Sequence, residues 1–320
     1  MNDQIMNRRG FLKMSGKAAL AAAALSAVPS FITNAIAQEN VSLEHLIEKT
    51  FPEFINAGYD YAIKPTEENK KKHNALAEQL RAEEQQAISK GILAYPLRYP
   101  NQVVSPELEK KGYLHERWKV DGKNIDSYLL GKIAKKEKEG DFSILHHFPL
   151  TSTFEEHLSG KNNISYRKNN EIYINLKQVD SDANFIILNK NGDSAENILC
   201  KRICEQFGAQ KEKIIKDILY TIKVHEAKGH SGESSVKDET RAILFEIKEA
   251  KSMYPVLSLL EMADYGRADE LHKKASQAVM GEIAKHKNPQ GQIYSGKNLA
   301  LAKLDDVKKI AQEIFESRFG

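Results

Sequence analysis

The apolar residues of this chain follow three successive patterns, and the first is helical. Over residues 41–92, apolar side chains recur every three or four positions, which is the period of a helix that buries one face. We expect two helices in this stretch, and Pro52 predicts a kink or a break in the first of them. The second should run over residues 66–90, because Gly91 follows it as a helix-ending residue.

The connection to the middle of the chain is less regular. Residues 93–112 contain three prolines, which predict an irregular segment. A further helix is expected over residues 125–138, ended by Gly140. We therefore assign residues 38–141 to an N-terminal helical region.

The second pattern, from residue 142 to about residue 190, is an alternation of apolar and polar positions. Such a two-residue period is typical of a strand with one buried face. It occurs in four short segments, residues 143–148, 164–166, 171–176 and 185–188. Turn residues separate these segments, as at Asn169-Asn170. The chain thus predicts a small sheet of about four strands.

The third pattern returns to the helical period and continues to the end of the chain. Helices are expected over residues 195–206, 214–222, 255–265, 268–285 and 301–317. The fold class that follows is α+β and mostly helical, with a small β-sheet preceding the helices that carry the candidate site. Cys200 and Cys204 lie on one helix and are expected to be buried thiols, because a disulfide within a regular helix would be strained.

The first 37 residues carry the features of an export signal. The sequence NRRGFLK at residues 7–13 resembles the twin-arginine consensus, and an alanine-rich apolar segment follows over residues 18–28. An A-x-A cleavage site places the cut between Ala37 and Gln38. We expect residues 1–37 to be a signal peptide for the twin-arginine export machinery, and the mature chain to reach the periplasm or to be secreted.

Removing this segment changes the charge balance. The whole chain has 47 lysines and arginines against 44 aspartates and glutamates, a formal net charge of +3. The expected signal holds four of the basic residues and one of the acidic ones, so a mature chain of 283 residues keeps 43 of each. A neutral chain does not favour nucleic acid as a partner. The apolar segment of the signal is short, and no stable membrane span is expected after cleavage.

Candidate chemistry is concentrated in the sequence VHEAKGH at residues 224–230. A catalytic zinc site needs three protein ligands and an open position for water, and neutral histidines are suitable ligands. His225 and His230 supply two of them. Glu226, next to the first histidine, is placed to take a proton from the activated water as a general base.

The five-residue spacing of the histidines leaves two local structures open. On a regular helix, residues i and i+5 point about 140° apart, so His225 and His230 would diverge. A π-bulge adds one residue to the turn and returns both to one face, and such bulges concentrate at functional sites. Gly229 would ease this distortion. Alternatively, Gly229 ends the helix and leaves His230 in a loop.

A third ligand is available on the next helix. Ser234 and Ser235 offer an N-cap for a helix whose first residues include DETRA at residues 238–242. A helix, a tight turn and a second helix would bring Glu239 back toward the histidines. We therefore expect His225, His230 and Glu239 to hold Zn²⁺. The alternative is a solvated helix end without metal.

The two motifs resemble those of a known peptidase family. HEAKGH resembles the HExxGH signature of the dipeptidyl peptidase III family of zinc peptidases, and DETRA resembles that family's EExRA motif, with Asp238 in place of the first glutamate. The wider resemblance is to gluzincins, zinc peptidases with two histidine ligands and one glutamate ligand. By this resemblance, His225, His230 and Glu239 ligate zinc, and Glu226 is the general base.

The resemblance also implies a fold and a reaction. It implies a zincin-like catalytic region over residues 142–320 that hydrolyses a peptide or protein substrate. Gluzincins place an edge strand over the active-site helix, and residues 172–176 are our candidate for it. Peptidases of this kind steady the oxyanion with a Tyr, His or Arg side chain. The candidates that follow the ligands are Tyr254, Tyr265, Arg267 and His272.

A competing hypothesis belongs to another class of protein. It is an exported, non-catalytic helical binding or scaffold protein that holds no metal. It predicts that Gly229 caps a helix and that Glu239 faces away from the histidines. The distances between the three expected ligands distinguish the two hypotheses.

Overall fold

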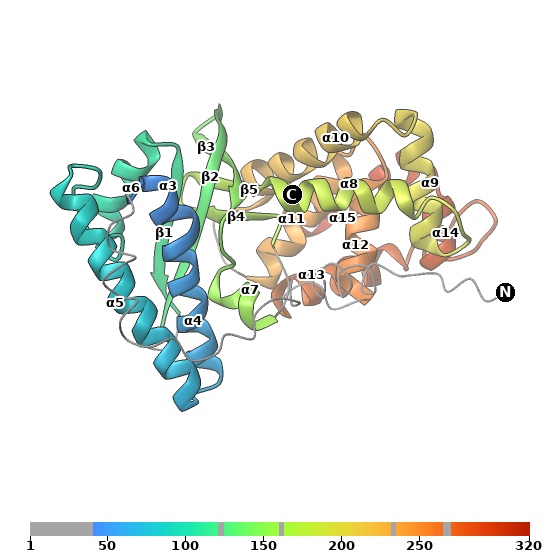
Figure 1. The fold of residues 1–320 in the computed structure, drawn as a ribbon. Coiled ribbons are helices and arrows are strands. Elements are labelled where there is room, and N and C mark those ends of the chain that lie inside the picture. The colour runs from blue at the N-terminus through green and yellow to red at the C-terminus, as the bar shows by residue number, and fades with distance from the viewer. Residues whose placement is uncertain (1–40, 121–124, 160–162, 232–234, 265–269) are drawn as a thin grey trace.

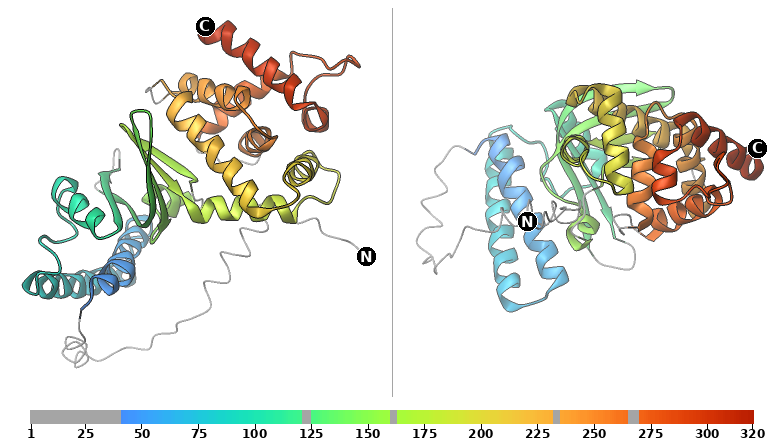
Figure 2. Two further views of the ribbon diagram at one scale, coloured as in Figure 1. Left: turned by 90° about the horizontal axis from the view of Figure 1, so that it is seen from above. Right: turned by 90° about the vertical axis from the view of Figure 1, so that its right-hand side faces the viewer.

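The computed structural model describes residues 41–120, 125–159, 163–231, 235–264 and 270–320. A five-stranded sheet stands between two groups of helices (Figure 1). Helices that precede the sheet cover one of its faces, and helices that follow it cover the other (Figure 2). The predicted α+β class, mostly helical, is confirmed. The expected signal peptide and its cleavage site between Ala37 and Gln38 lie outside the described residues.

The N-terminal group begins with a continuous run of α-helical and π-helical turns. α3 (Leu43–His45), the π-helical turn η1 (Leu46–Thr50) and α4 (Phe51–Ile63) follow one another directly, and α5 (Glu67–Ser89) packs beside α4. The irregularity expected at Pro52 takes the form of the π turn just before it. Pro52 itself lies in the first turn of α4, where its missing N–H is least disruptive.

A helix also occupies part of the stretch that was expected to be irregular. α6 (Asn101–Lys110) follows Pro100, which stands at its N-cap position. Val104 and Leu108 lie four residues apart and are buried on this helix, which packs against the first strand of the sheet. Tertiary packing of this apolar face therefore outweighs the helix-breaking tendency of the nearby prolines.

The sheet has the strand order β1-β2-β3-β5-β4. Its strands are β1 (Tyr113–Lys119), β2 (Asp126–Glu139), β3 (Phe142–Pro149), β4 (Ser165–Lys168) and β5 (Glu171–Asn175). β3 and β5 are parallel, and the other neighbours are antiparallel. Ile144, Ile172 and Ile174 are buried in the hydrophobic core that the sheet shares with the C-terminal helices. α7 (Phe154–Ser159) follows β3 and contacts α4.

Two predicted elements are of the wrong type. The helix expected over residues 125–138 is strand β2, so residues 38–141 are not a purely helical region. β2 pairs with both β1 and β3, and these ladders override the helix-favouring lysines and glutamates of its exposed half. The strand expected over residues 185–188 is the end of helix α8 (Leu176–Leu188), whose buried Val179, Ala183 and Ile186 follow the helical period.

The remaining helices form the C-terminal group. They are α9 (Ala195–Phe207), α10 (Lys211–Lys223), the π-helical η2 (Val224–Gly229), α11 (Val236–Lys248), α12 (Tyr254–Asp264), α13 (Glu270–Ile283), α14 (Gly296–Leu301) and α15 (Leu304–Phe319). α11 packs against η2, α13 and α15. Cys200 and Cys204 are buried free thiols, as predicted. Among the described residues, no helix combines the length and apolar character needed to cross a membrane.

Candidate metal centre

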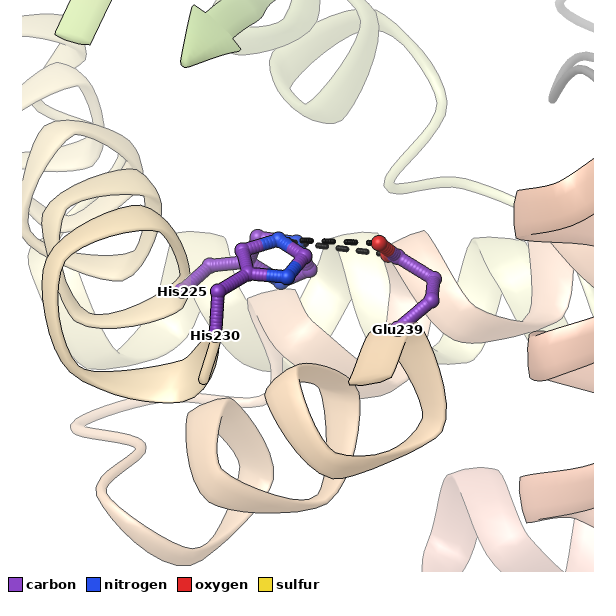
Figure 3. Close-up of side chains that lie close together, drawn as sticks. All are labelled: His225, His230 and Glu239. Carbon is purple, nitrogen blue, oxygen red and sulfur yellow. Dashed lines mark hydrogen bonds and ion pairs between the residues drawn. The ribbon is translucent and has the colours of Figure 1, made fainter. Parts of the chain in front are cut away.

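The candidate histidines are carried by a π-helical turn. α10 leads directly into η2, and His230 follows with an extended backbone, at φ −75° and ψ 143°. The π turn inserts the extra residue that the five-residue spacing requires, so His225 and His230 lie side by side (Figure 3). The chain combines the two local structures compatible with the sequence: a π turn carries His225, and Gly229 ends the helix, so that His230 lies in the extended segment that follows.

Gly229 allows η2 to approach the next helix closely. A Cβ atom at this position would lie 2.8 Å from Ala242 Cα and 2.9 Å from Ala242 Cβ, closer than carbon atoms pack. Arg241 donates a hydrogen bond from Nη1 to the Gly229 carbonyl, and its guanidinium lies 5.6 Å from the centre of the Phe315 ring. The glycine of the first motif and the Arg-Ala pair of the second therefore form one helix–helix contact.

This contact places Glu239, in the first turn of α11, opposite the two histidines (Figure 3). His225 Nε2 lies 3.2 Å from His230 Nε2 and 3.3 Å from Glu239 Oε1, and His230 Nε2 lies 3.6 Å from Glu239 Oε2. One donor atom from each of the three residues lies within 4.8 Å of the others. Ser235 caps α11 by accepting a hydrogen bond from the Asp238 N–H. The three residues form a cluster that could hold a metal ion.

Two further carboxylates, which the sequence reasoning missed, orient the imidazoles. Glu246 Oε2 lies 2.8 Å from His225 Nδ1, and Asp238 Oδ2 lies 2.7 Å from His230 Nδ1. Each Nδ1 can donate its proton to the neighbouring carboxylate, which leaves the two Nε2 atoms facing the cluster as the atoms available to a metal ion. A signal for Glu246 was present in the sequence, since it follows Glu239 by about two helical turns on the same face.

The cluster brings the two imidazoles against a buried carboxylate. Both Nε2 atoms face Glu239, whose Oε1 atom is buried without a hydrogen-bond partner. Burial alone would raise the pKa of Glu239, but the neighbouring His225 lowers it to about 2. Burial would likewise lower the pKa of His225, whereas Glu239 and Glu246 raise it well above its usual value. The cluster therefore favours positive charge, which a proton on His225 or a divalent metal ion can supply.

Glu226 lies beside the cluster. Its Oε2 atom is 4.0 Å from His230 Nε2. Ser165 donates its hydroxyl to Glu226 Oε1 at 2.6 Å, and Arg167 donates from Nη1 to the Glu226 carbonyl at 2.9 Å. Both partners belong to β4, and no motif singled them out. A carboxylate held in this way can accept a proton from a water molecule between it and the cluster.

The strand beside Glu226 is β4, and the prediction that residues 172–176 form the edge is wrong. β5 lies inside the sheet, between β3 and β4. β4 forms the edge because a turn, in which Asn169 adopts the left-handed region at φ 55°, folds the chain back along β4. β4 has only four residues, and they are partly or fully exposed. The alternation of apolar and polar side chains is therefore too weak to identify it as an edge strand from the sequence.

The four candidates for oxyanion stabilisation differ in where they lie. His272, on α13, places Nε2 3.5 Å from Glu239 Oε1. Tyr254 is buried, and its hydroxyl donates to Asp182 of α8. Tyr265 and Arg267 lie outside the described residues.

Comparisons of this chain with protein-family models, with curated proteins and with solved structures found no significant match.

Proposed function

We propose that this chain is an exported zinc-dependent metallohydrolase, and that it hydrolyses peptide bonds. The observation that carries the proposal is the convergence of His225, His230 and Glu239, with the Glu226 carboxylate beside them. Two histidines and one glutamate are the ligand set of gluzincins, which the two motifs resemble. Three protein ligands leave a fourth position open for water or substrate.

The donor atoms favour zinc among the common divalent cations. Calcium and magnesium prefer oxygen ligands in shells of six or more atoms, whereas two imidazoles and one carboxylate suit zinc in low coordination. Glu246 and Asp238 support the same choice, because zinc-binding histidines usually donate their other N–H to a carboxylate or a carbonyl.

The proposed reaction assigns a task to each neighbouring side chain. A bound zinc would supply activation of water and polarisation of the substrate carbonyl. Glu226 accepts a proton from the attacking water and passes it to the amine as the C–N bond breaks. Ser165 holds Glu226 Oε1, which leaves Oε2 on the side of His230 for proton transfer. His272 is the described residue best placed to stabilise the oxyanion.

Two features support a peptide as the substrate class. β4 ends the sheet beside Glu226, and an extended peptide can add to such an edge as a further strand. The resemblance of both motifs to zinc peptidases points to the same substrate, and with it to a zincin-like catalytic region over residues 142–320. The twin-arginine-like N-terminus supports export to the periplasm or beyond, where the substrate would be met.

Metal content and a single-atom change in the general base test the proposal together. Purified mature chain should contain about one zinc per molecule, and the double variant His225→Ala/His230→Ala should contain none. Glu226→Gln should keep its zinc but lose peptide hydrolysis by about 10²- to 10⁴-fold, because the amide cannot accept the proton. Glu212→Gln, an exposed change on α10, is the matched control and should alter neither measurement.

Other results would contradict parts of the proposal. A folded wild-type chain that takes up no zinc would refute the enzyme and leave an exported helical binding or scaffold protein. Zinc that binds normally, with no loss of any measured function in Glu226→Gln, would indicate a zinc-binding protein without catalysis.

A further inference from the structure

A second site lies on another side of η2. An open pocket of about 510 Å³ is lined by the β2–β3 hairpin, α8, α10 and η2. We call it the basic pocket, and its polar wall consists of Lys135, Glu139, His146, Lys216, Lys223 and Lys228. The metal cluster residues do not line it. The pocket is therefore separate from the proposed active centre, although both share the turn formed by η2.

The basic pocket keeps an excess of positive charge after its internal ion pairs are counted. Lys135 and Lys223 both contact Glu137, which lies beside the pocket, so one carboxylate is shared by two ammonium groups. Lys228 pairs with Glu139 at 3.4 Å. Lys216 forms no ion pair with any described residue. Four lysines thus face two carboxylates.

Glu137 cannot reduce this positive excess by gaining further negative charge. Burial alone would raise the pKa of Glu137, but hydrogen bonds from Lys135 and Lys223 lower it to about 2, so it is already fully ionised. His146 Nε2 adds a third contact to the same carboxylate at 2.9 Å. Both oxygens of Glu137 therefore already contact donors, and the Lys216 ammonium group is left to water or to a ligand.

The apolar lining of the basic pocket indicates the character of such a ligand. Leu176, Leu219 and Val224 line the pocket together with the lysines. Lys216, Leu219 and Lys223 lie three and seven residues apart on α10, so their side chains project along one face of that helix. A pocket lined by both lysines and apolar side chains suits a small organic molecule that carries charged groups.

We propose that the basic pocket binds a small molecule carrying two or more negative charges, as phosphate or carboxylate groups. The net excess of two positive charges matches a dianion, and the volume accommodates a molecule of metabolite size. Phosphate esters and polycarboxylates share this chemistry. Lysine recognises both as a point charge rather than through a fixed fork of donors.

Isothermal titration calorimetry tests the proposal directly. Pyrophosphate and tricarballylate are titrated separately into metal-free mature chain at about 0.15 M salt, where non-specific surface attraction is screened. We expect saturable binding of at least one of the two with a stoichiometry of about one. The charge reversals Lys216→Glu and Lys135→Glu should each weaken it about tenfold or more, because each replaces an attraction with a repulsion.

Two controls locate the binding. Lys71→Glu removes an exposed lysine on α5, far along the chain from the basic pocket, and should bind the probes as wild type does. His225→Ala/His230→Ala should also retain binding, which separates this site from the metal centre and keeps the result independent of the proposed hydrolase. Preference for pyrophosphate would identify a phosphate-bearing ligand, and preference for tricarballylate a polycarboxylate.

Three results would overturn the proposal. They are the absence of saturable binding by both probes, equal weakening in Lys71→Glu, and undiminished binding in both Lys216→Glu and Lys135→Glu. Circular dichroism of each variant verifies that it is folded before titration, and Lys216 is exposed, so its replacement leaves the core intact.

Discussion

Adding one methyl group at Gly229 should damage the metal centre, although this residue itself supplies no ligand atom. Gly229→Ala would place Cβ 2.8 Å from Ala242 Cα, 2.9 Å from its Cβ and 3.2 Å from its carbonyl oxygen. An ordinary carbon–carbon contact is about 3.5 Å, so η2 and α11 must separate locally by about 0.7 Å. All three atoms belong to Ala242 of α11. Its backbone and its short side chain cannot move aside as the end of a long, flexible side chain would.

The separation has two measurable consequences. Overpacking of this kind destabilises by about 1–3 kcal/mol, which lowers Tm by about 2–5 °C in a chain of this size. Glu239 lies on α11 one turn before Ala242, whereas His225 lies on η2, so the ligands move apart by a similar distance. Metal–ligand distances tolerate about 0.2 Å, and we expect zinc affinity to fall about 10- to 100-fold.

Gly281→Ala is the matched control. Gly281 lies inside α13, and a Cβ there would meet no atom within 4 Å. Alanine should stabilise that helix by about 0.5–1 kcal/mol and leave zinc affinity unchanged. Thermal unfolding with and without chelator, and competition for zinc with a chelating dye, measure both effects. A Gly229→Ala variant as stable as Gly281→Ala, with wild-type zinc affinity, would refute the close-contact argument.

Three other outcomes are expected. Glu246→Gln should weaken zinc binding about 10- to 100-fold in chelator competition, because His225 loses the carboxylate that fixes its orientation; an unchanged affinity would count against this role. Ser165→Ala should keep zinc but lower kcat for peptide hydrolysis about tenfold or more, because Glu226 loses a charged hydrogen bond; an undiminished kcat would contradict it. Burial lowers the pKa of His147 to about 4, while the unfolded chain binds that proton near pH 6.5, so the unfolded state holds more protons in this window. The contribution of His147 to the free energy of unfolding should therefore fall by about 2 kcal/mol from pH 7 to pH 5. In His147→Leu, the free energy of unfolding measured by urea titration should fall by about 2 kcal/mol less over this pH range than in the wild type. An equal fall in both proteins would refute the argument.

Much of the candidate site could be predicted because its parts are local. The five-residue spacing of His225 and His230 requires either a π turn or divergent side chains, and this choice concerns one turn of helix. Ser235 caps α11 through a bond three residues away. Glu239 follows within the same short segment. Residues that are close in the sequence cannot lie far apart in space. The spacing of the two motifs therefore limits how the candidate ligands can be arranged.

The same locality explains which elements were wrong. The charged half of β2 has good helix formers, and only pairing with β1 and β3 makes it a strand. Residues 185–188 are uniformly apolar, a pattern that a short strand and a buried helix end share. Neither ambiguity can be resolved without the neighbours that the folded chain supplies.

By itself, the sequence determined the mixed fold class, the helical character of the chain after residue 195, and the three residues that converge as a candidate metal cluster. Only the tertiary structure decided that β4 is the sheet edge, that Ser165 reaches Glu226 across 61 residues of chain, and that lysines from β2 and α10 share one pocket. The physical reason is the range of the interactions. Helical period, capping and motif spacing act over a few residues, whereas strand pairing and the meeting of distant side chains depend on how the whole chain packs.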